Sequence, residues 1–241
     1  KARRTERRAA SRTSSERLDQ GHVMEEIEGS GTTTADQRGV KDASKPYGIF
    51  LRSLGWLLLK LGRWTIIGER PSERKLVVVA APHTSNWDFI WVLAFATHYQ
   101  VRISWLGKHT LFKAPFGGFM RWLGGIPVRR NRRDNLVEGL IETFGEYKAL
   151  ALAVPPEGTR DATDHWKSGF YHIARGANVP ILLSFLCYEN RTGGFGPTIV
   201  ATGDVRADMD RVREFYRDKV GKRADLFSHI RLREEEETSP A

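Results

Sequence analysis

The segment Ala81-Pro-His-Thr-Ser-Asn-Trp-Asp88 places a histidine and a carboxylate five residues apart, directly after a short apolar run. An imidazole whose one ring nitrogen is held by a carboxylate can take a proton from a hydroxyl with its other nitrogen. His83 and Asp88 are therefore a candidate general base and its orienting partner. His-x4-Asp is also common in ordinary loops. The alternative is that Asp88 caps a helix and His83 is a surface residue.

Arginine side chains gather in two further segments of the chain. Their guanidinium groups are planar, always charged and suited to binding the oxygens of a phosphate. They are Arg129, Arg130, Arg132, Arg133 and Arg160. For the first four the alternative is a solvated basic turn, and Glu157, which precedes Arg160, could be a structural cap.

Four sequence blocks occur in order at regular spacing. They are His83-x4-Asp88, the Gly- and Ile-containing block 107–130 that ends in arginine, Pro156-Glu-Gly-Thr-Arg160, and Val179-Pro-Ile181. This set resembles the glycerolipid acyltransferase family, which includes the lysophosphatidic acid (1-acylglycerol-3-phosphate) acyltransferases. The resemblance covers roughly residues 76–190 and implies an α/β fold like that of the glycerol-phosphate acyltransferases.

The resemblance also implies roles for individual residues. It makes His83 the general base and Asp88 its partner, and it places Pro180 on the acyl-donor side of the site. The residues it assigns to the substrate phosphate are Lys108, Arg130, Glu157, Gly158, Thr159 and Arg160. Two positions depart from the family pattern: Pro155 stands where an aromatic residue is common, and Arg129 stands where an acidic residue is common.

The expected reaction follows from these roles and from what the sequence lacks. There is no Gly-x-Ser-x-Gly motif, and the single cysteine, Cys187, lies in an apolar run and is expected to be buried. Direct transfer without an acyl-enzyme is therefore expected. The resemblance implies an acyl thioester donor, either acyl-CoA or acyl-carrier protein, and an acceptor that is lysophosphatidic acid or glycerol 3-phosphate, in phospholipid biosynthesis. We expect no cofactor and no metal site.

Three other functions remain open from the sequence. The same residues could acylate another membrane-associated acceptor, or they could activate water in a thioesterase-type hydrolase. A non-enzymatic lipid- or nucleic-acid-binding module would also fit the net charge of +9. We expect no nucleic-acid partner, because the aromatic residues cluster with leucines rather than alternate with basic residues.

Strand-like and helix-like segments alternate along the middle of the chain. We predict strands at 76–81, 101–106, 126–128, 150–154, 179–188 and 198–202, and helices at 88–98, 116–123, 135–147, 167–175 and 209–220. This alternation is typical of an α/β fold with a central mixed sheet flanked by helices. The sheet would place His83 just beyond the carboxyl end of a buried strand, where such folds hold their active sites.

Composition divides the chain into three parts. Residues 1–45 are polar and are expected to be a disordered tail. Residues 46–233 form the predicted acyltransferase domain, and residues 234–241 are predicted to be a solvated acidic tail.

The segment 47–64 is apolar and aromatic but is interrupted by basic residues. This pattern favours a helix that lies in the plane of an anionic membrane surface over one that crosses the membrane. A helix packed into the domain core is the alternative. We predict membrane contact by Phe50, Leu54, Trp56, Leu57, Leu58 and Trp64, and a peripheral, monotopic location on the cytoplasmic face of the cell membrane.

Overall fold

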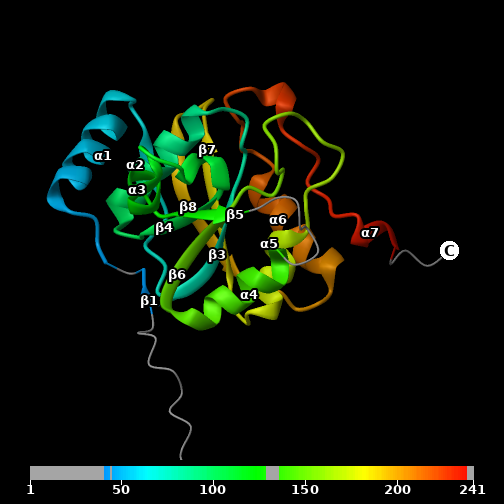
Figure 1. Cartoon of the computed structure of the whole chain (residues 1–241). Helices are drawn as coiled ribbons and strands as arrows, with labels where there is room; N and C mark the ends of the chain where they lie inside the picture. The colour runs from blue at the N-terminus through cyan, green and yellow to red at the C-terminus, as the bar shows by residue number, and fades with distance from the viewer. Residues whose placement is uncertain (1–40, 44, 129–135, 238–241) are drawn as a thin grey trace, which may run out of the picture. The chain divides into compact units, whose positions relative to one another are not determined.

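The structure is a computed structural model, and it describes residues 41–43, 45–128 and 136–237. Its centre is a mostly parallel sheet of eight strands in the order β2-β8-β7-β3-β6-β4-β5, with β1 beside the first residues of β6 (Figure 1). The pair β7–β8 is antiparallel, and the other pairs are parallel. The sheet is therefore mixed, as the sequence predicts.

The strands have the following bounds: β1 Lys41–Asp42, β2 Thr65–Ile67, β3 Lys75–Ala80, β4 Ile103–Lys108, β5 Gly125–Val128, β6 Tyr147–Val154, β7 Ile181–Cys187 and β8 Thr192–Ile199. The α-helices are α1 Ile49–Leu61, α2 Trp87–Tyr99, α3 Gly117–Trp122, α4 Leu136–Glu146, α5 Gly169–Gly176, α6 Val205–Tyr216 and α7 Glu234–Glu237. Two 3-10 helices, η1 His109–Phe112 and η3 Ala224–Leu226, lie in the connections.

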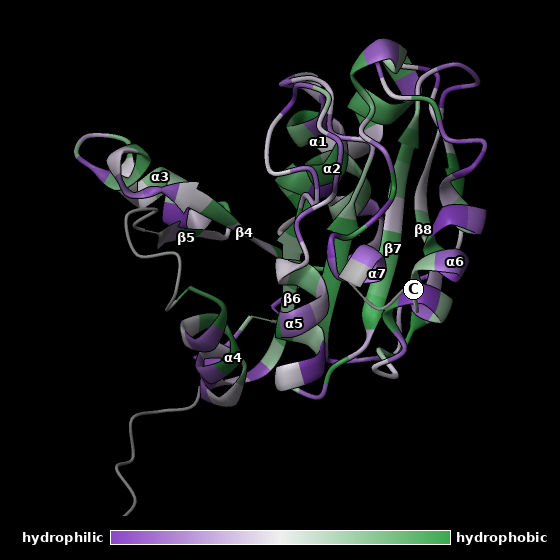
Figure 2. Cartoon of the chain, turned by 90° about the vertical axis from the view of Figure 1, so that its right-hand side faces the viewer, coloured by the Kyte–Doolittle hydropathy of each residue, from purple (hydrophilic) through white to green (hydrophobic). Residues whose placement is uncertain are grey.

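Two apolar cores cover the two faces of the sheet. Successive side chains of a strand point to opposite faces, and β3 shows this directly. Val77 and Val79 pack with residues of α4, α5 and α6, whereas Leu76 and Val78 pack with residues of α1 and α2. Strand β7, hydrophobic along its length, runs through the middle of the domain (Figure 2). A sheet buried on both faces gives a rigid edge on which to build a site.

Helix α1 packs closely on α2 through Gly55. A Cβ atom at this position would lie 2.0 Å from the Thr97 hydroxyl oxygen, so only glycine allows this approach. Leu59 is buried in the same contact, while the opposite side of α1 carries exposed apolar residues. The helix thus has one face in the core and one face outside it.

Most of the predicted elements are present within a few residues of their predicted bounds. Cys187 is fully buried and unpaired, as expected. The main differences concern the last strand and helix. The strand predicted at 198–202 is β8, which begins six residues earlier, and the helix predicted at 209–220 is α6, which begins at Val205.

The ends of the domain also differ from their predicted bounds. Residues 1–40 of the predicted tail lie outside the described residues, but Lys41 and Asp42 already pair with β6. At the other end, residues 234–237 form α7 rather than a solvated segment. Glu235 is buried because its carboxylate accepts the Leu232 N–H and pairs with Arg213.

Candidate active site

His83 and Asp88 face each other where β3 leads into α2. His83 Nδ1 lies 3.5 Å from Asp88 Oδ2; the histidine side chain is 28% exposed and the aspartate side chain 2%. This separation is longer than an optimal hydrogen bond, but catalytic contacts commonly shorten when a substrate binds. With Nδ1 turned toward the carboxylate, Nε2 is the nitrogen left to take up a proton.

The Asp88 carboxylate is held from both sides. Its Oδ2 accepts the backbone N–H groups of Thr84 and Ser85, each at 2.8 Å, and its Oδ1 accepts the Tyr188 hydroxyl at 2.6 Å. Desolvation by burial, together with the hydrogen bond to Asp88, raises the pKa of Tyr188, so this hydroxyl stays a donor. Asp88 is therefore fixed in place before any substrate arrives.

Glu157 fixes the backbone of the histidine. Its carboxylate, 1% exposed, accepts the His83 N–H at 2.9 Å for Oε2 and 3.2 Å for Oε1. Burial raises the pKa of Glu157 from 4.5 to about 8; the His83 N–H opposes this shift, and the Asp88 charge adds to it. Glu157 thus serves as a largely protonated support under the loop 81–86 that carries His83, which we call the catalytic loop. This position does not support the assignment of Glu157 to the substrate phosphate.

The turn after Glu157 carries the other residues of this block. Gly158 has φ +68°, a left-handed conformation that favours glycine, and its N–H donates to the Pro155 carbonyl. The turn leads the chain outward to Thr159 and to the exposed Arg160. The tight turn therefore lets one short segment supply both the buried Glu157 and an exposed cation.

A cavity of about 610 Å³ lies where this turn meets the loop that follows His83. Its lining comes from three segments, and the residues are Ser85, Asn86, Trp87, Thr159, Arg160, Asp161, Lys222 and Arg223. A volume of this size suits a small-molecule site. The structure thus brings the loop after His83 and the turn at Arg160 together around one polar cavity.

Lys108 is the last residue of β4 and is exposed. Strand β4 pairs in parallel with β6, and β6 pairs in parallel with β3, so all three strands end at one edge of the sheet. This edge also carries His83, which follows β3, and Glu157, which follows β6. Lys108 therefore shares the catalytic edge, while Arg130 lies outside the described residues.

Pro180 is at the opposite edge of the sheet. It immediately precedes β7, its carbonyl accepts the Val77 N–H, and Ile181 is level with Val77. Pro180 is then level with Leu76, about five residues or roughly 16 Å along β3 from the catalytic edge. The assignment of Pro180 to the acyl-donor side of the site is not supported by this position.

Tyr188, Lys222 and Arg223 belong to this site but are not among the residues predicted from the sequence. Tyr188 follows β7, and the other two follow α6. Arg223 binds the catalytic loop directly, because its N–H donates to the Thr84 hydroxyl at 3.2 Å and its Nε to the Thr84 carbonyl at 3.1 Å. No sequence motif marks them; only the fold brings them to His83.

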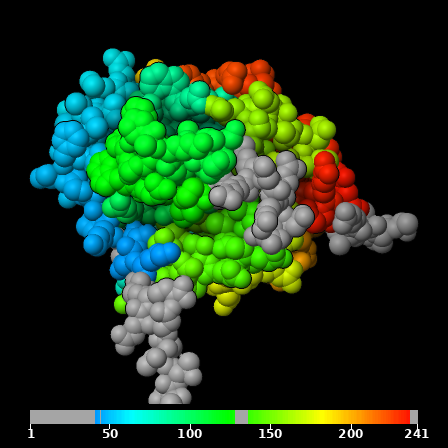
Figure 3. All heavy atoms as spheres, viewed as in Figure 1, coloured from blue at the N-terminus to red at the C-terminus, as the bar shows by residue number. Residues whose placement is uncertain are grey.

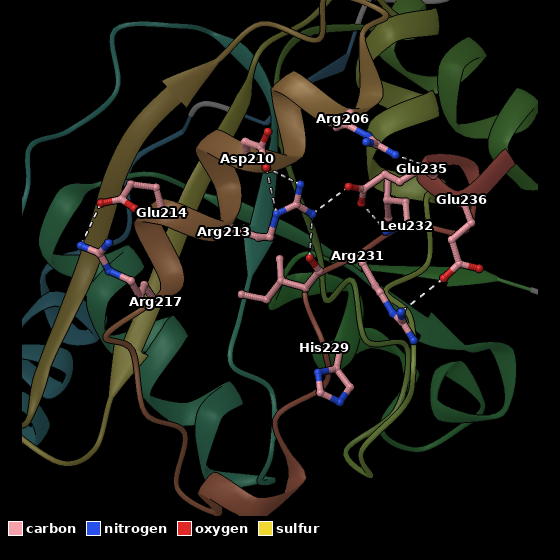
Figure 4. A pocket seen from close by; sticks show the side chains of 11 residues that line it. Arg206, Asp210, Arg213, Glu214, Arg217, His229, Arg231, Leu232, Glu235 and Glu236 are labelled. Atoms are coloured by element: carbon pink, nitrogen blue, oxygen red, sulfur yellow. Dashed lines mark hydrogen bonds and ion pairs between the residues drawn. The ribbon is translucent and has the colours of Figure 1, made fainter. Parts of the chain in front are cut away.

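A larger cavity, of about 1260 Å³, lies elsewhere, between α6 and the segment that leads to α7 (Figure 4). Its charged groups pair with one another. Arg213 contacts Asp210 at 2.6 Å and Glu235 at 2.8 Å, and similar pairs join Arg217 to Glu214 and Arg231 to Glu236. Because these groups neutralise one another, the cavity is better explained by ion pairs that hold the C-terminal segment against α6 than by a binding site.

The predicted membrane-contacting residues divide into three groups by exposure. Phe50, Leu54, Trp56 and Leu57 are exposed on α1, which lies at the left border of the face in Figure 3. Leu58 is half-buried against the core. The predicted membrane contact of Trp64 is wrong, because its side chain is buried. Arg63, in the left-handed conformation at φ +56°, turns the chain inward after α1.

Trp64 then packs among aromatic rings of the core. Its ring centroid lies 5.3 Å from that of Trp91, 5.8 Å from that of Phe95 and 5.1 Å from that of Tyr188. Trp64 thus helps to hold the Tyr188 ring in place. Among the described residues, no helix combines the length and apolarity needed to cross a membrane, and no group of His, Cys, Asp and Glu could hold a metal ion.

Comparison with known proteins gives two matches. A family model described as "Acyltransferase" matches residues 63–182, which include His83, Asp88 and the Glu157–Arg160 turn. The crystal structure of the 1-acyl-sn-glycerophosphate (LPA) acyltransferase PlsC from Thermotoga maritima is similar, with a TM-score of 0.51 and 18% identity over 80% of each chain. At this identity the likeness concerns the fold. No curated protein sequence matches the chain.

Proposed function

Because the chain belongs to the acyltransferase family, we propose that it transfers a fatty acyl group from a thioester to a hydroxyl of a phosphate-bearing glycerolipid precursor. The observation that carries this proposal is the arrangement at one sheet edge: a histidine beside a buried aspartate, next to a cavity lined by Arg160, Lys222 and Arg223. The acceptor is lysophosphatidic acid or glycerol 3-phosphate, and the donor is acyl-CoA or acyl-carrier protein. The reaction belongs to phospholipid biosynthesis.

In the proposed reaction the acceptor hydroxyl gives its proton to His83 Nε2. Its oxygen attacks the thioester carbonyl, the carbon–sulfur bond breaks, and the thiolate leaves and takes up the proton from the histidine. Asp88 stabilises the imidazolium that exists between these steps. The network of Thr84, Ser85 and Tyr188 supports this role, since a fixed carboxylate needs little reorganisation as charge develops.

Basic residues at the same edge support an acceptor that carries a phosphate. Arg160 lines the cavity and Lys108 ends β4. We include Arg130 in this role from the family resemblance. An uncharged acceptor would leave these cations without a partner, so the phosphate is part of the proposal.

We further propose that the protein works on an anionic membrane surface, as a peripheral protein of the cytoplasmic face. The exposed apolar side chains of α1 support this location. Phe50 is 75% exposed and Trp56 57% exposed, and the Lys60 ammonium lies 4.8 Å from the Trp56 ring centroid. Aromatic and basic groups side by side suit the headgroup region of a bilayer.

The proposed function is tested by the acceptor requirement of thioester cleavage. Thiol release from palmitoyl-CoA is measured with detergent-solubilised protein and with no acceptor, glycerol, glycerol 3-phosphate or lysophosphatidic acid. The proposal predicts release only with a phosphorylated acceptor, together with formation of the acylated lipid. Equal release without an acceptor would instead identify a thioesterase, and release with glycerol alone would identify an acyltransferase that ignores the phosphate.

A further inference from the structure

The segment that follows α6 forms a third wall of the active-site cavity, beside the loop after His83 and the turn at Arg160. It lies outside the 63–182 region matched by the family model. Gly221 packs against the catalytic loop so tightly that a Cβ there would lie 2.8 Å from the Thr84 hydroxyl oxygen. The Val220 carbonyl accepts the N–H of Tyr188 at 2.8 Å. The segment is thus in contact with Thr84 and Tyr188, two of the residues that hold Asp88.

This wall adds two cations to the cavity. Arg160, Lys222 and Arg223 line it together with one carboxylate, Asp161. Within the described residues, none of the three cations forms an ion pair with a carboxylate. The cavity therefore has an excess of positive charge that the protein itself does not neutralise, unlike the larger cavity beside α6.

The two added cations are also held in position. Arg223 lines the cavity and donates from Nε to the Thr84 carbonyl at 3.1 Å, which fixes its guanidinium group. Within the described part of the chain its two terminal nitrogens form no hydrogen bond or ion pair, so both can donate to a ligand. The Lys222 ammonium lies 5.2 Å from the ring centroid of Trp87, a cation–π contact that holds the charge beside the cavity. Guanidinium and ammonium groups fixed in this way are typical of phosphate recognition.

We propose that Lys222 and Arg223, together with Arg160, bind a phosphate ester of one of the two substrates. This inference rests on the proposed function and deepens it, because it assigns substrate recognition to a segment outside the family blocks. The phosphate belongs either to the acceptor, as in glycerol 3-phosphate, or to the donor, as in the 3′-phosphate of CoA. The two sources share the same chemistry and are distinguished by experiment.

The test measures binding rather than turnover, so it stands apart from the test of the reaction. Isothermal titration is carried out on protein that carries His83→Ala, with two pairs of ligands: glycerol 3-phosphate against glycerol, and CoA against dephospho-CoA. The variants are Lys222→Gln, Arg223→Gln and both together. Arg211→Gln is the matched control, because it removes an exposed arginine of α6 that does not line the cavity.

We expect each substitution to weaken binding of a phosphorylated ligand about tenfold, as for the loss of one charge-assisted hydrogen bond. Arg211→Gln leaves that affinity unchanged, and the ligand without the phosphate is insensitive to all variants. Weakening confined to glycerol 3-phosphate assigns the phosphate to the acceptor, and weakening confined to CoA assigns it to the donor.

Two results would overturn the proposal. One is a double variant that binds both phosphorylated ligands as tightly as the Arg211→Gln protein does. The other is absence of binding by the Arg211→Gln protein itself. Lys222→Gln keeps the result interpretable if Arg223→Gln disturbs folding, since the Lys222 side chain makes no hydrogen bond to the catalytic loop among the described contacts. A failed binding test would leave acyl transfer by His83 open, and failed transfer would leave the binding result intact.

Discussion

The hydroxyl of Tyr188 donates a 2.6 Å hydrogen bond to Oδ1 of Asp88, a residue 100 positions earlier in the chain. Strand β7 ends one residue before Tyr188, and α2 begins one residue before Asp88. The bond therefore ties the end of β7 to the start of α2, the helix that carries Asp88. The Tyr188 ring also contacts the ring of Trp64, which lies just after α1, so this helix is connected to Asp88 as well.

Replacement of Tyr188 by phenylalanine tests this connection. The change removes one donor from a buried carboxylate, and a hydrogen bond to a charged group contributes about 1.5–3 kcal/mol. We expect kcat to fall about tenfold with little change in KM, since Tyr188 acts on the substrate only through Asp88 and His83. Steady-state kinetics over a range of acceptor concentrations measure both constants.

Tyr171→Phe is the matched control for this variant. Tyr171 donates a 2.8 Å hydrogen bond to the buried carboxylate of Asp208, away from the catalytic loop. Both variants should lose stability by a similar amount, but only Tyr188→Phe should lose kcat. An equal loss of activity in the two variants would mean that Tyr188 contributes only to stability.

Glu157 gives the protein a pH-dependent stability of defined sign. Its pKa is about 8 in the folded chain, above its ordinary value of 4.5, so the folded state keeps a proton that the unfolded state releases between these values. Its contribution to the free energy of unfolding is therefore fully present below pH 4.5 and is lost as pH rises through about 8.

Glu157→Gln removes this titration and keeps a carbonyl oxygen for the His83 N–H. The free energy of unfolding of the variant, measured with urea, should rise relative to wild type between pH 5 and pH 9. One unit of pKa difference corresponds to about 1.4 kcal/mol, so the change should reach several kcal/mol. Glu138→Gln, at an exposed position of α4, serves as the control. A difference between variant and wild type that stays constant with pH would show that Glu157 is charged in the folded state at neutral pH.

The exposed side of α1 is tested by substitutions that spare its buried side. Deletion of 47–64 would also remove Leu59 and Trp64 from the core. The double variant Phe50→Ser, Trp56→Ser changes only exposed positions. Each aromatic side chain buried in a bilayer contributes about 1.5–3 kcal/mol, so association with anionic vesicles should fall at least tenfold in a flotation assay.

Val200→Ser is the control for this variant, because Val200 is 66% exposed but lies outside α1. Truncation of residues 1–40 should lower vesicle association less than the double variant does. The proposed membrane role of α1 would be refuted if the truncation had the larger effect.

The sequence was sufficient for the parts of the fold that are encoded locally. A short apolar, β-branched run predicted β3, the apolar periodicity of 135–147 predicted α4, and the His83-x4-Asp88 spacing predicted that these two side chains meet. The predicted strand begins six residues later than β8 does, because Gly193, Gly194 and Gly196 are typical of a loop. It is a strand because it pairs with β7 and β2, and local composition does not record that pairing.

The remainder of the site depends on contacts between distant parts of the chain. Arg223 meets Thr84 across 139 residues, and nothing in the residues around it distinguishes it from other surface arginines. Trp64 lies in an apolar run that has the pattern of a membrane helix, yet one left-handed residue turns it into the core. Pro180 stands in one of the four sequence blocks, but the direction of the parallel strand β7 places it at the far edge.

The most direct test of the central claim measures the acceptor-dependent release of thiol from palmitoyl-CoA by His83→Ala protein and by wild type. His98→Ala is the control, because His98 is an exposed histidine in the last turn of α2. A general base contributes about 10²- to 10⁴-fold to the rate. We predict that His83→Ala lowers kcat by at least about a hundredfold with the fold intact by circular dichroism, and that His98→Ala retains wild-type activity. A folded His83→Ala protein that releases thiol and forms acylated lipid at the wild-type rate would contradict the account.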